Sequence, residues 1–241
     1  MRILAIDTST SWCSVALCFD DQPIVHRHEL LGSKASQHLL PWCSKLLQQH
    51  GARFSDLDAL AVGVGPGAFT GVRLSVAVAQ GLSIGSQLPV IPVTSLDAMA
   101  SQFAKQYQTP QHKTFIIALD ARMGEVYWAR YQQGALQPKP INPIQLTAPD
   151  YIEDNGQDFI AGNALAEYAD YFKDHFVGRQ IDAQLVPNTL GILDLAQLRY
   201  QAGQSISVEQ LEPLYIRNKV ALTTQERHDA ASLAPTGHLL G

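Results

Sequence analysis

The chain has 241 residues, of which 46% are hydrophobic and 16% charged, and its formal net charge at pH 7 is −5. This composition suits a globular protein with enough chain to bury a core. Because no cluster of lysine or arginine stands out, the chain lacks a basic footprint for nucleic acid, and any such role needs a partner that supplies the positive surface.

Cysteine usage and the first residues indicate the compartment. Cys13, Cys18 and Cys43 show no CxxC spacing, so we expect buried, reduced thiols rather than disulfides or a zinc site. The segment before Asp7 has one basic residue and resembles neither a signal peptide nor a membrane anchor. No apolar run approaches the length that spans a bilayer. We therefore expect a cytoplasmic protein without membrane contact.

The first half of the chain alternates between short apolar runs and longer segments whose apolar residues have helical spacing. The first apolar run ends at Asp7, and a hydroxyl-rich turn follows it. We expect Ser33 to cap the first long helix and Pro41 to kink or break it. In chain order, the predicted elements are strands at 2–6, 12–19 and 23–30, a helix at 34–50, a strand at 57–64, a helix at 70–86, a strand at 89–93, and a helix from Thr94 or Ser95 to about Tyr107.

The same order of elements starts again at Thr114. An apolar run at 115–119 ends at Asp120, as the first run ends at Asp7, and a polar turn at 121–124 follows. The further predicted elements are a strand at 125–131, an extended stretch to Leu146, a short helix at 149–155, a strand at 158–161, and helices at 163–172 and 190–202. Sequence identity between the halves is slight, so the repeated order of elements is what suggests duplication.

Two such halves form the plan of the actin, Hsp70 and sugar-kinase fold. We therefore expect an α/β protein of two duplicated actin-like, ribonuclease H-like lobes, each a mixed sheet with flanking helices. The first lobe would span 1–108 and the second 109–222, with room for the last helix to pack back on the first lobe. Residues 223–241 hold few packing residues and read as a loose tail.

A glycine-rich loop, GVGPGAFTG, joins the strand at 57–64 to the helix at 70–86. Such a loop leaves backbone N–H groups bare at a helix start, which suits an anion. It is not a P-loop, because no GK[ST] follows and Arg73 lies a full turn into the helix. It matches the dinucleotide fingerprint only loosely, since no acidic residue ends the next strand. The alternative is a tight turn whose glycines permit close packing.

The turn after the first strand is the other candidate phosphate loop. Asp7, Thr8 and Ser9 resemble the Asp-x-Gly-Thr turn of actin-like ATPases, with Ser9 in place of the glycine. The corresponding second turn carries Arg122 and Met123, where a phosphate loop wants small residues. The alternative is a pair of ordinary hairpin turns with solvated aspartates.

The sequence shows neither the residue pattern of a metal site nor that of a catalytic site. His26 and His28 share a strand face but have no nearby cysteine or acidic cluster. The sequence shows no carboxylate pair, no Gly-x-Ser-x-Gly elbow and no Cys–His spacing typical of a nucleophile. We therefore expect no resident metal and no catalytic residue.

The surfaces of two helices remain as candidate sites. The helix at 70–86 is apolar almost all round and rich in small residues, which predicts burial on more than one side, by the protein's own sheet or by a partner. The helix at 34–50 is expected to expose Trp42 beside Pro41. Adjacent helices of this kind form a reasonable docking patch, and an ordinary core is the alternative.

Four segments resemble the TsaB (YeaZ) family: MRILAIDTSTSWCSVAL, GVGPGAFTGVRLSVAVAQGL, IALDARMGEVYWARY and EPLYIRN. The resemblance implies that the chain is a non-catalytic subunit of a bacterial complex. This complex synthesises N6-threonylcarbamoyladenosine at position 37 of ANN-reading tRNAs. The resemblance also implies TsaD and TsaE as partners, a homodimer when alone, tRNA contact only through the complex, and ATP or ADP only at the complex interface. By the same resemblance, the partner interface would include His38, Leu39, Trp42, Leu46, Thr70, Arg73, Leu74 and Ala77.

One departure from the pattern of TsaD-like proteins bears on whether the chain catalyses the transfer itself. TsaD-like proteins carry a metal-binding HxxxH after a strand similar to VIPV, and here these positions are Ser95 and Met99. Neither side chain replaces imidazole as a metal ligand, which argues against independent transfer chemistry. An actin-like ATPase, suggested by Asp7 and Asp120, stays as the main alternative function, and a glycoprotease-like peptidase as a further one.

Overall fold

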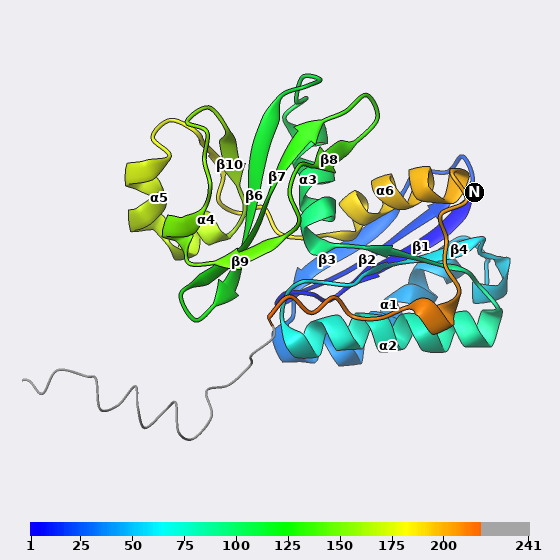
Figure 1. The fold of residues 1–241 in the computed structure, drawn as a ribbon. Coiled ribbons are helices and arrows are strands. Elements are labelled where there is room, and N and C mark those ends of the chain that lie inside the picture. The colour runs from blue at the N-terminus through cyan, green and yellow to red at the C-terminus, as the bar shows by residue number, and fades with distance from the viewer. Residues whose placement is uncertain (218–241) are drawn as a thin grey trace, which may run out of the picture.

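Two β-sheets, each covered by helices on both faces, form the two lobes of the protein (Figure 1). The computed structural model describes residues 1–217, so the predicted loose tail at 223–241 and the last residues of the predicted second lobe lie outside the described residues. None of the helices in the described part is long and apolar enough to cross a membrane.

The first sheet has the strand order β3-β2-β1-β4-β5. Its strands are β1 (Arg2–Asp7), β2 (Trp12–Phe19), β3 (Val25–Leu30), β4 (Ala59–Gly63) and β5 (Val90–Val93). Successive side chains of β1 enter two different cores, as the two-residue period of a strand requires. Leu4 and Ile6 lie on one face, and Ile3 and Ala5 lie on the other. The first face packs on α1 (Ala35–Gln49) and α2 (Phe69–Ser86), and the second on α6 (Thr189–Gln201).

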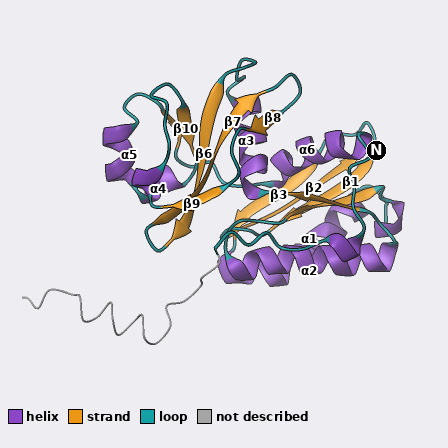
Figure 2. Ribbon diagram, in the orientation of Figure 1, coloured by secondary structure: helices purple, strands orange, loops and turns teal. Residues whose placement is uncertain are grey.

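The second sheet has the strand order β11-β10-β6-β7-β8, and β9 also pairs with β7. Its strands are β6 (Thr114–Arg122), β7 (Glu125–Gln133), β8 (Pro138–Pro140), β9 (Gln145–Thr147), β10 (Phe159–Ala161) and β11 (Gln180–Asp182). One face packs on α3 (Ser95–Gln106), and the other on α4 (Ala164–Glu167) and α5 (Ala169–His175). Figure 2 shows the two sheets with their covering helices, and α3 and α6 lie between them.

The predicted duplication is confirmed by strand direction as well as by strand order. β1 pairs antiparallel with β2 and parallel with β4, which pairs parallel with β5. β6 likewise pairs antiparallel with β7 and parallel with β10, which pairs parallel with β11. The halves differ in their connections, since α1 has no helical counterpart beyond a short 3-10 turn at Pro149–Tyr151.

The last helix of each half packs on the sheet of the other half. α3 follows β5 in the chain but contributes Phe103 to the core of the second sheet. α6 follows β11 but contributes Ile192 to the core of the first sheet. The two helices contact each other between the sheets (Figure 1). There Arg199 of α6 forms an ion pair with Asp97 of α3 at 3.1 Å. This exchange joins the lobes through two buried helices.

Several local predictions are corrected. Ser33 does not cap α1, because a 3-10 turn at Gly32–Lys34 precedes the helix and no side chain caps it. Pro41 does not break α1, which continues to Gln49 because its apolar stripe packs on the sheet on both sides of the proline. The turn predicted at 121–124 is shorter, since β6 runs on to Arg122. The helix predicted at 149–155 is only the Pro149–Tyr151 turn, and that at 163–172 is divided into α4 and α5.

Candidate functional site

The glycine-rich loop between β4 and α2 packs against the protein's own first hairpin turn. A side chain at Gly67 would clash with the carbonyl oxygen of Ser9, and one at Gly71 with that of Thr8. The Ala68 N–H donates to the Ser9 carbonyl at 2.7 Å. The loop therefore brings two backbones into contact, which supports the close-packing interpretation of its glycines.

Asp7 lies fully buried at the end of β1, against Gly63 of the neighbouring strand. A Cβ at Gly63 would clash with the Asp7 carboxyl, so glycine on β4 makes room for it. Burial raises the pKa of Asp7 to about 7, and hydrogen bonds from the Ser9 hydroxyl and backbone lower it only in part. Within residues 1–217, Asp7 Oδ1 has no hydrogen-bond partner. The alternative of a solvated aspartate at this turn is therefore wrong.

The other two predicted nucleotide-loop residues also use their side chains internally. Thr8 Oγ1 donates to the Gly71 carbonyl at 2.6 Å, and Ser9 Oγ donates to Asp7 Oδ2 at 3.1 Å. Both residues are buried. Thr8 does not line the cavity between the two hairpin turns, whereas Ser9 does.

The second hairpin turn is held by charge pairing. Asp120 accepts hydrogen bonds from the Arg122 backbone N–H at 2.8 Å and from the Tyr168 hydroxyl at 3.2 Å. The Arg122 guanidinium forms an ion pair with Asp120 at 3.1 Å. The Asp120 side chain is only 5% exposed, so the alternative of a solvated aspartate is wrong here too. Its carboxylate is engaged by its own lobe.

The two hairpin turns face each other across a cavity of about 290 Å³ between the lobes. Its lining includes Thr10, Ser11 and Trp12 from the first turn, and Asp120 and Arg122 from the second. Hydroxyls and one guanidinium on these walls suit an anionic or hydroxylated ligand. Asp7 and Thr8 do not line the cavity, so they are not the residues a ligand there would touch.

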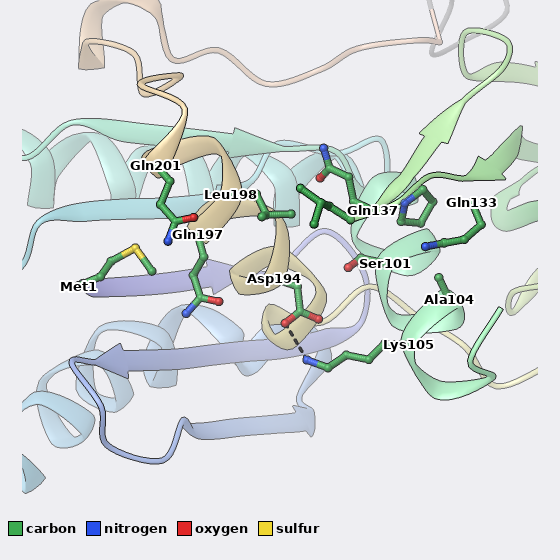
Figure 3. Close-up of a pocket in the computed structure, with 12 residues that line it drawn as sticks. Met1, Ser101, Ala104, Lys105, Gln133, Gln137, Asp194, Gln197, Leu198 and Gln201 are labelled. Carbon is green, nitrogen blue, oxygen red and sulfur yellow. Dashed lines mark hydrogen bonds and ion pairs between the residues drawn. The ribbon is translucent and has the colours of Figure 1, made fainter. Parts of the chain in front are cut away.

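A second interlobe cavity, of about 540 Å³, lies between α3, α6 and the β7–β8 hairpin. Figure 3 shows Gln133 and Gln137 on one side and Gln197 and Gln201 on the other, with Lys105 reaching Asp194. The ion pair between Lys105 and Asp194 is 2.9 Å long and joins α3 to α6. These polar residues form no recognisable sequence motif, so the sequence carried no signal for the cavity.

One face of α2 is exposed to solvent. Thr70, Arg73, Ala77, Gly81 and Ile84 are all exposed and follow one another at three- and four-residue spacing, so they form one stripe. We call these five residues the α2 stripe. Ile84 is 70% exposed, which is unusual for so large an apolar side chain. The described chain therefore leaves this side of α2 open, so of the two predicted ways of covering it only a partner remains.

Arg73 is fixed at the start of this stripe. Its Nε donates to the Tyr215 hydroxyl at 2.7 Å, and its guanidinium lies 3.8 Å from the centre of the Phe69 ring. The segment that carries Tyr215 runs along α2, where the Leu214 N–H donates to the Val64 carbonyl at 2.7 Å. Leu74 is half-buried beside Arg73 and belongs to the edge of the core.

The predicted interface residues of α1 lie elsewhere. Leu39, Trp42 and Leu46 belong to the buried core between α1 and the first sheet, and Trp42 is only 5% exposed. Their helical spacing marks the face that packs on the sheet. The prediction that α1 exposes Trp42 is therefore wrong. His38 is half-buried, and its ring lies 5.8 Å from that of Trp42.

The positions aligned with the metal-binding histidines of TsaD-like proteins are also internal. Ser95 and Met99 are both buried on α3, and Met99 packs in the core of the second sheet. A hydroxyl and a thioether in such a core do not replace the two imidazole ligands that TsaD-like proteins carry at these positions. Across residues 1–217, no group of three or more His, Cys, Asp or Glu side chains is placed to hold a metal ion.

Comparison with known proteins identifies the family. The family model for TsaD, tRNA N6-adenosine threonylcarbamoyltransferase, matches residues 29–156. The chain is 35% identical to the tRNA threonylcarbamoyladenosine biosynthesis protein TsaB of Haemophilus influenzae, over 91% of this chain and 95% of the relative. It is also 35% identical to TsaB of Escherichia coli, over 92% of this chain and 96% of the relative.

Solved structures agree with the sequence relatives. A protein of Pseudomonas aeruginosa described as similar to the peptidase YEAZ superposes with a TM-score of 0.80 at 32% identity, covering 90% of this chain and 99% of that one. YeaZ from Pseudomonas aeruginosa gives a TM-score of 0.79 at 31% identity, covering 89% and 99%. The chain therefore belongs to the TsaB (YeaZ) family, a branch of the group that the TsaD family model describes.

Proposed function

We propose that this chain is a non-catalytic subunit of tRNA N6-threonylcarbamoyladenosine synthesis, which binds and activates a TsaD-type transferase together with TsaE. The names of its relatives support a place in this modification. The observation that carries the subunit role is the α2 stripe, which stays exposed among the described residues and in which small and apolar side chains follow Thr70 and Arg73.

The α2 stripe has the properties of a helix-docking surface. At the centre of the stripe, Ala77 has a small side chain and Gly81 has none, and Ile84 projects at one end. A second helix can approach closely over small residues, so that van der Waals contact extends along both helices. Arg73 adds a charge that is held in place by Phe69 and Tyr215. In the absence of the transferase, the same face pairs with a second copy of this chain.

The described residues give little support to catalysis of the threonylcarbamoyl transfer by this chain itself. The transferase family carries metal-binding histidines where this chain has Ser95 and Met99, and both are buried. The contribution of this chain is therefore to position and stabilise the transferase. The tRNA contacts the partner subunits rather than this acidic chain, whose net charge is −5.

The alternative of an actin-like ATPase is less well supported. The carboxyl that would serve it, Asp7, is fully buried and lies outside the lining of the cavity between the hairpin turns. Any ATP or ADP is expected at the interface of the assembled complex. A glycoprotease-like activity has no described nucleophile–base pair in favour of it.

A charge placed in the α2 stripe tests the proposal. Ala77→Glu puts a carboxylate at the centre of the stripe, and Ala169→Glu is its matched control, because Ala169 is an exposed alanine on α5 of the other lobe. Burying an unpaired charge in an interface costs about 3–5 kcal/mol, so Ala77→Glu should weaken binding to the TsaD-type transferase by about 100-fold or more.

Light scattering after gel filtration and reconstituted tRNA modification provide the measurements. Ala169→Glu should bind and support modification as the wild type does, and both variants should keep the wild-type circular dichroism spectrum. Wild-type binding by Ala77→Glu would place the interface elsewhere. Leu39→Glu is unsuitable for this test, because Leu39 is fully buried and the charge would disrupt the fold itself.

A further inference from the structure

A pocket lined by aromatic rings opens where α3 ends before it has covered the corner of the second sheet. α3 ends at Gln106, and the chain turns away through Gln108, whose φ of 46° is left-handed. The corner left open, above β6, β10 and β11, holds a pocket of about 200 Å³. Its walls include Phe103, Tyr107, Phe115, Phe159, Ile181 and Lys113.

The aromatic walls are fixed by the fold. Phe159 and Phe115 are direct partners in the parallel pairing of β10 and β6, so both side chains lie on the sheet face beneath α3. The Phe103 ring lies 4.6 Å from that of Phe115 and 5.0 Å from that of Tyr107. The Tyr107 hydroxyl donates to Asp182 Oδ2 at 3.2 Å. A flat apolar ligand would meet preformed ring surfaces rather than mobile side chains.

One cation at this apolar pocket has no ion-pair partner among the described residues. Lys113 precedes β6, and its ammonium lies 5.1 Å from the centre of the Phe159 ring. Within residues 1–217, no carboxylate forms an ion pair with Lys113. The nearby Asp182 carboxylate accepts from Tyr107 and disfavours a second negative charge beside that wall. The charges therefore select an anion on the Lys113 side of an aromatic group.

We propose that this pocket binds a small monocarboxylic acid that carries one aromatic ring. The ring packs against Phe115 and Phe159, and the carboxylate pairs with Lys113. The site lies at the opposite end of β6 from the hairpin turn that carries Asp120. It is therefore separate from the cavity between the two hairpin turns. A pocket of this size with one exposed ion pair gives a dissociation constant on the order of 1 mM.

Titration of the full chain with 3-phenylpropionate tests this assignment. Two-dimensional NMR of the labelled protein should show saturable shifts at Lys113, Phe115, Phe159 and Ile181. Phenethylamine has the ring with the opposite charge, and butyrate has the carboxylate without a ring. Each should bind at least about two-fold more weakly, because each loses either the ion pair or the ring contacts.

Two variants separate the charge from the cavity. Lys113→Gln keeps the side-chain stem and removes the charge, so the affinity for 3-phenylpropionate should fall about two- to five-fold. Lys173→Gln, on exposed α5, is the matched control and should not change it. Ile181→Trp fills the mouth and should abolish the saturable shifts. Shifts that fail to saturate, equal binding of phenethylamine, or unchanged binding by Lys113→Gln would each overturn the assignment.

Discussion

A methyl group added at Gly81 should stabilise the lone chain and weaken its complexes. Gly81 is exposed inside α2, and a Cβ there would meet no described atom within 4 Å. Glycine in a helix interior is about 0.8–1 kcal/mol less favourable than alanine. Since no described contact requires a glycine at this position, Gly81→Ala should raise the free energy of unfolding by about that amount. For a chain of this size the midpoint temperature should rise by about 2–4 °C.

The effect on association has the opposite sign. If a partner helix packs closely over the α2 stripe, the added methyl overfills that contact, at a cost of about 1–3 kcal/mol. Binding to the transferase should then weaken by about 5- to 150-fold. A general loss of fold would lower stability and binding together, so opposite changes in the two quantities are diagnostic of a glycine kept for a partner.

Calorimetry measures the first quantity, and isothermal titration with the TsaD-type transferase measures the second. The Ala77→Glu and Ala169→Glu variants calibrate the binding range. A Gly81→Ala chain that is more stable and binds as tightly as the wild type would refute close packing over Gly81. A chain that is less stable would refute the helix-propensity argument, because it would require an intramolecular contact at this glycine.

Two further predictions concern buried carboxyl groups. The pKa of Asp7 is raised by burial to about 7, so the folded state holds the proton more tightly than the unfolded state and stability falls as pH rises from about 4 to 7, on the order of a few kcal/mol. Asp7→Asn should remove this decline in urea midpoints measured from pH 4 to 8. Asp158 is fully buried and pairs with Arg130 at 2.7 Å, so Arg130→Met should cost about 3–5 kcal/mol by leaving its charge unpaired.

Each of these predictions has an internal control. For Asp7, the comparison is the difference between wild type and variant at each pH, since all other carboxyl groups titrate in both proteins. Equal pH dependence in the two proteins would mean that folding does not raise the pKa of Asp7. For the ion pair, Arg130→Met combined with Asp158→Asn removes both charges and should recover most of the lost stability. A double variant as unstable as the single one would show that packing of the Arg130 stem dominates.

The strand plan was predictable because apolar runs that end in aspartate occur at the same point of both halves. What the sequence could not predict is which faces are covered. The stripe that contains Leu39, Trp42 and Leu46 reads equally well as a docking patch or as a core, and packing on the first sheet decides for the core. β11 was missed because Gln180–Asp182 has one apolar residue between two polar ones, a pattern too short to distinguish from a loop.

The state of Asp7 illustrates a limit of the same kind at the candidate site. The sequence pattern of a strand that ends in aspartate is the same whether the carboxyl contacts water or protein. Here the outcome depends on Gly63, a residue of a different strand, whose missing side chain leaves space for the carboxyl. The pairing of β1 with β4 that brings them together is a tertiary contact. Local pattern therefore located the turn but not its chemistry.

The duplication also indicates where the function resides. The two halves share strand order and direction, so features common to both serve the fold. The first half alone has a pair of long helices, α1 and α2, on the outer face of its sheet, whereas the second half has the shorter α4 and α5 there. α1 anchors its stripe in the core, and α2 keeps small residues on the outside. Selection for folding alone would favour alanine over Gly81. Under the proposed function, a partner that packs closely on α2 would account for the glycine in this helix, the longest of the described chain.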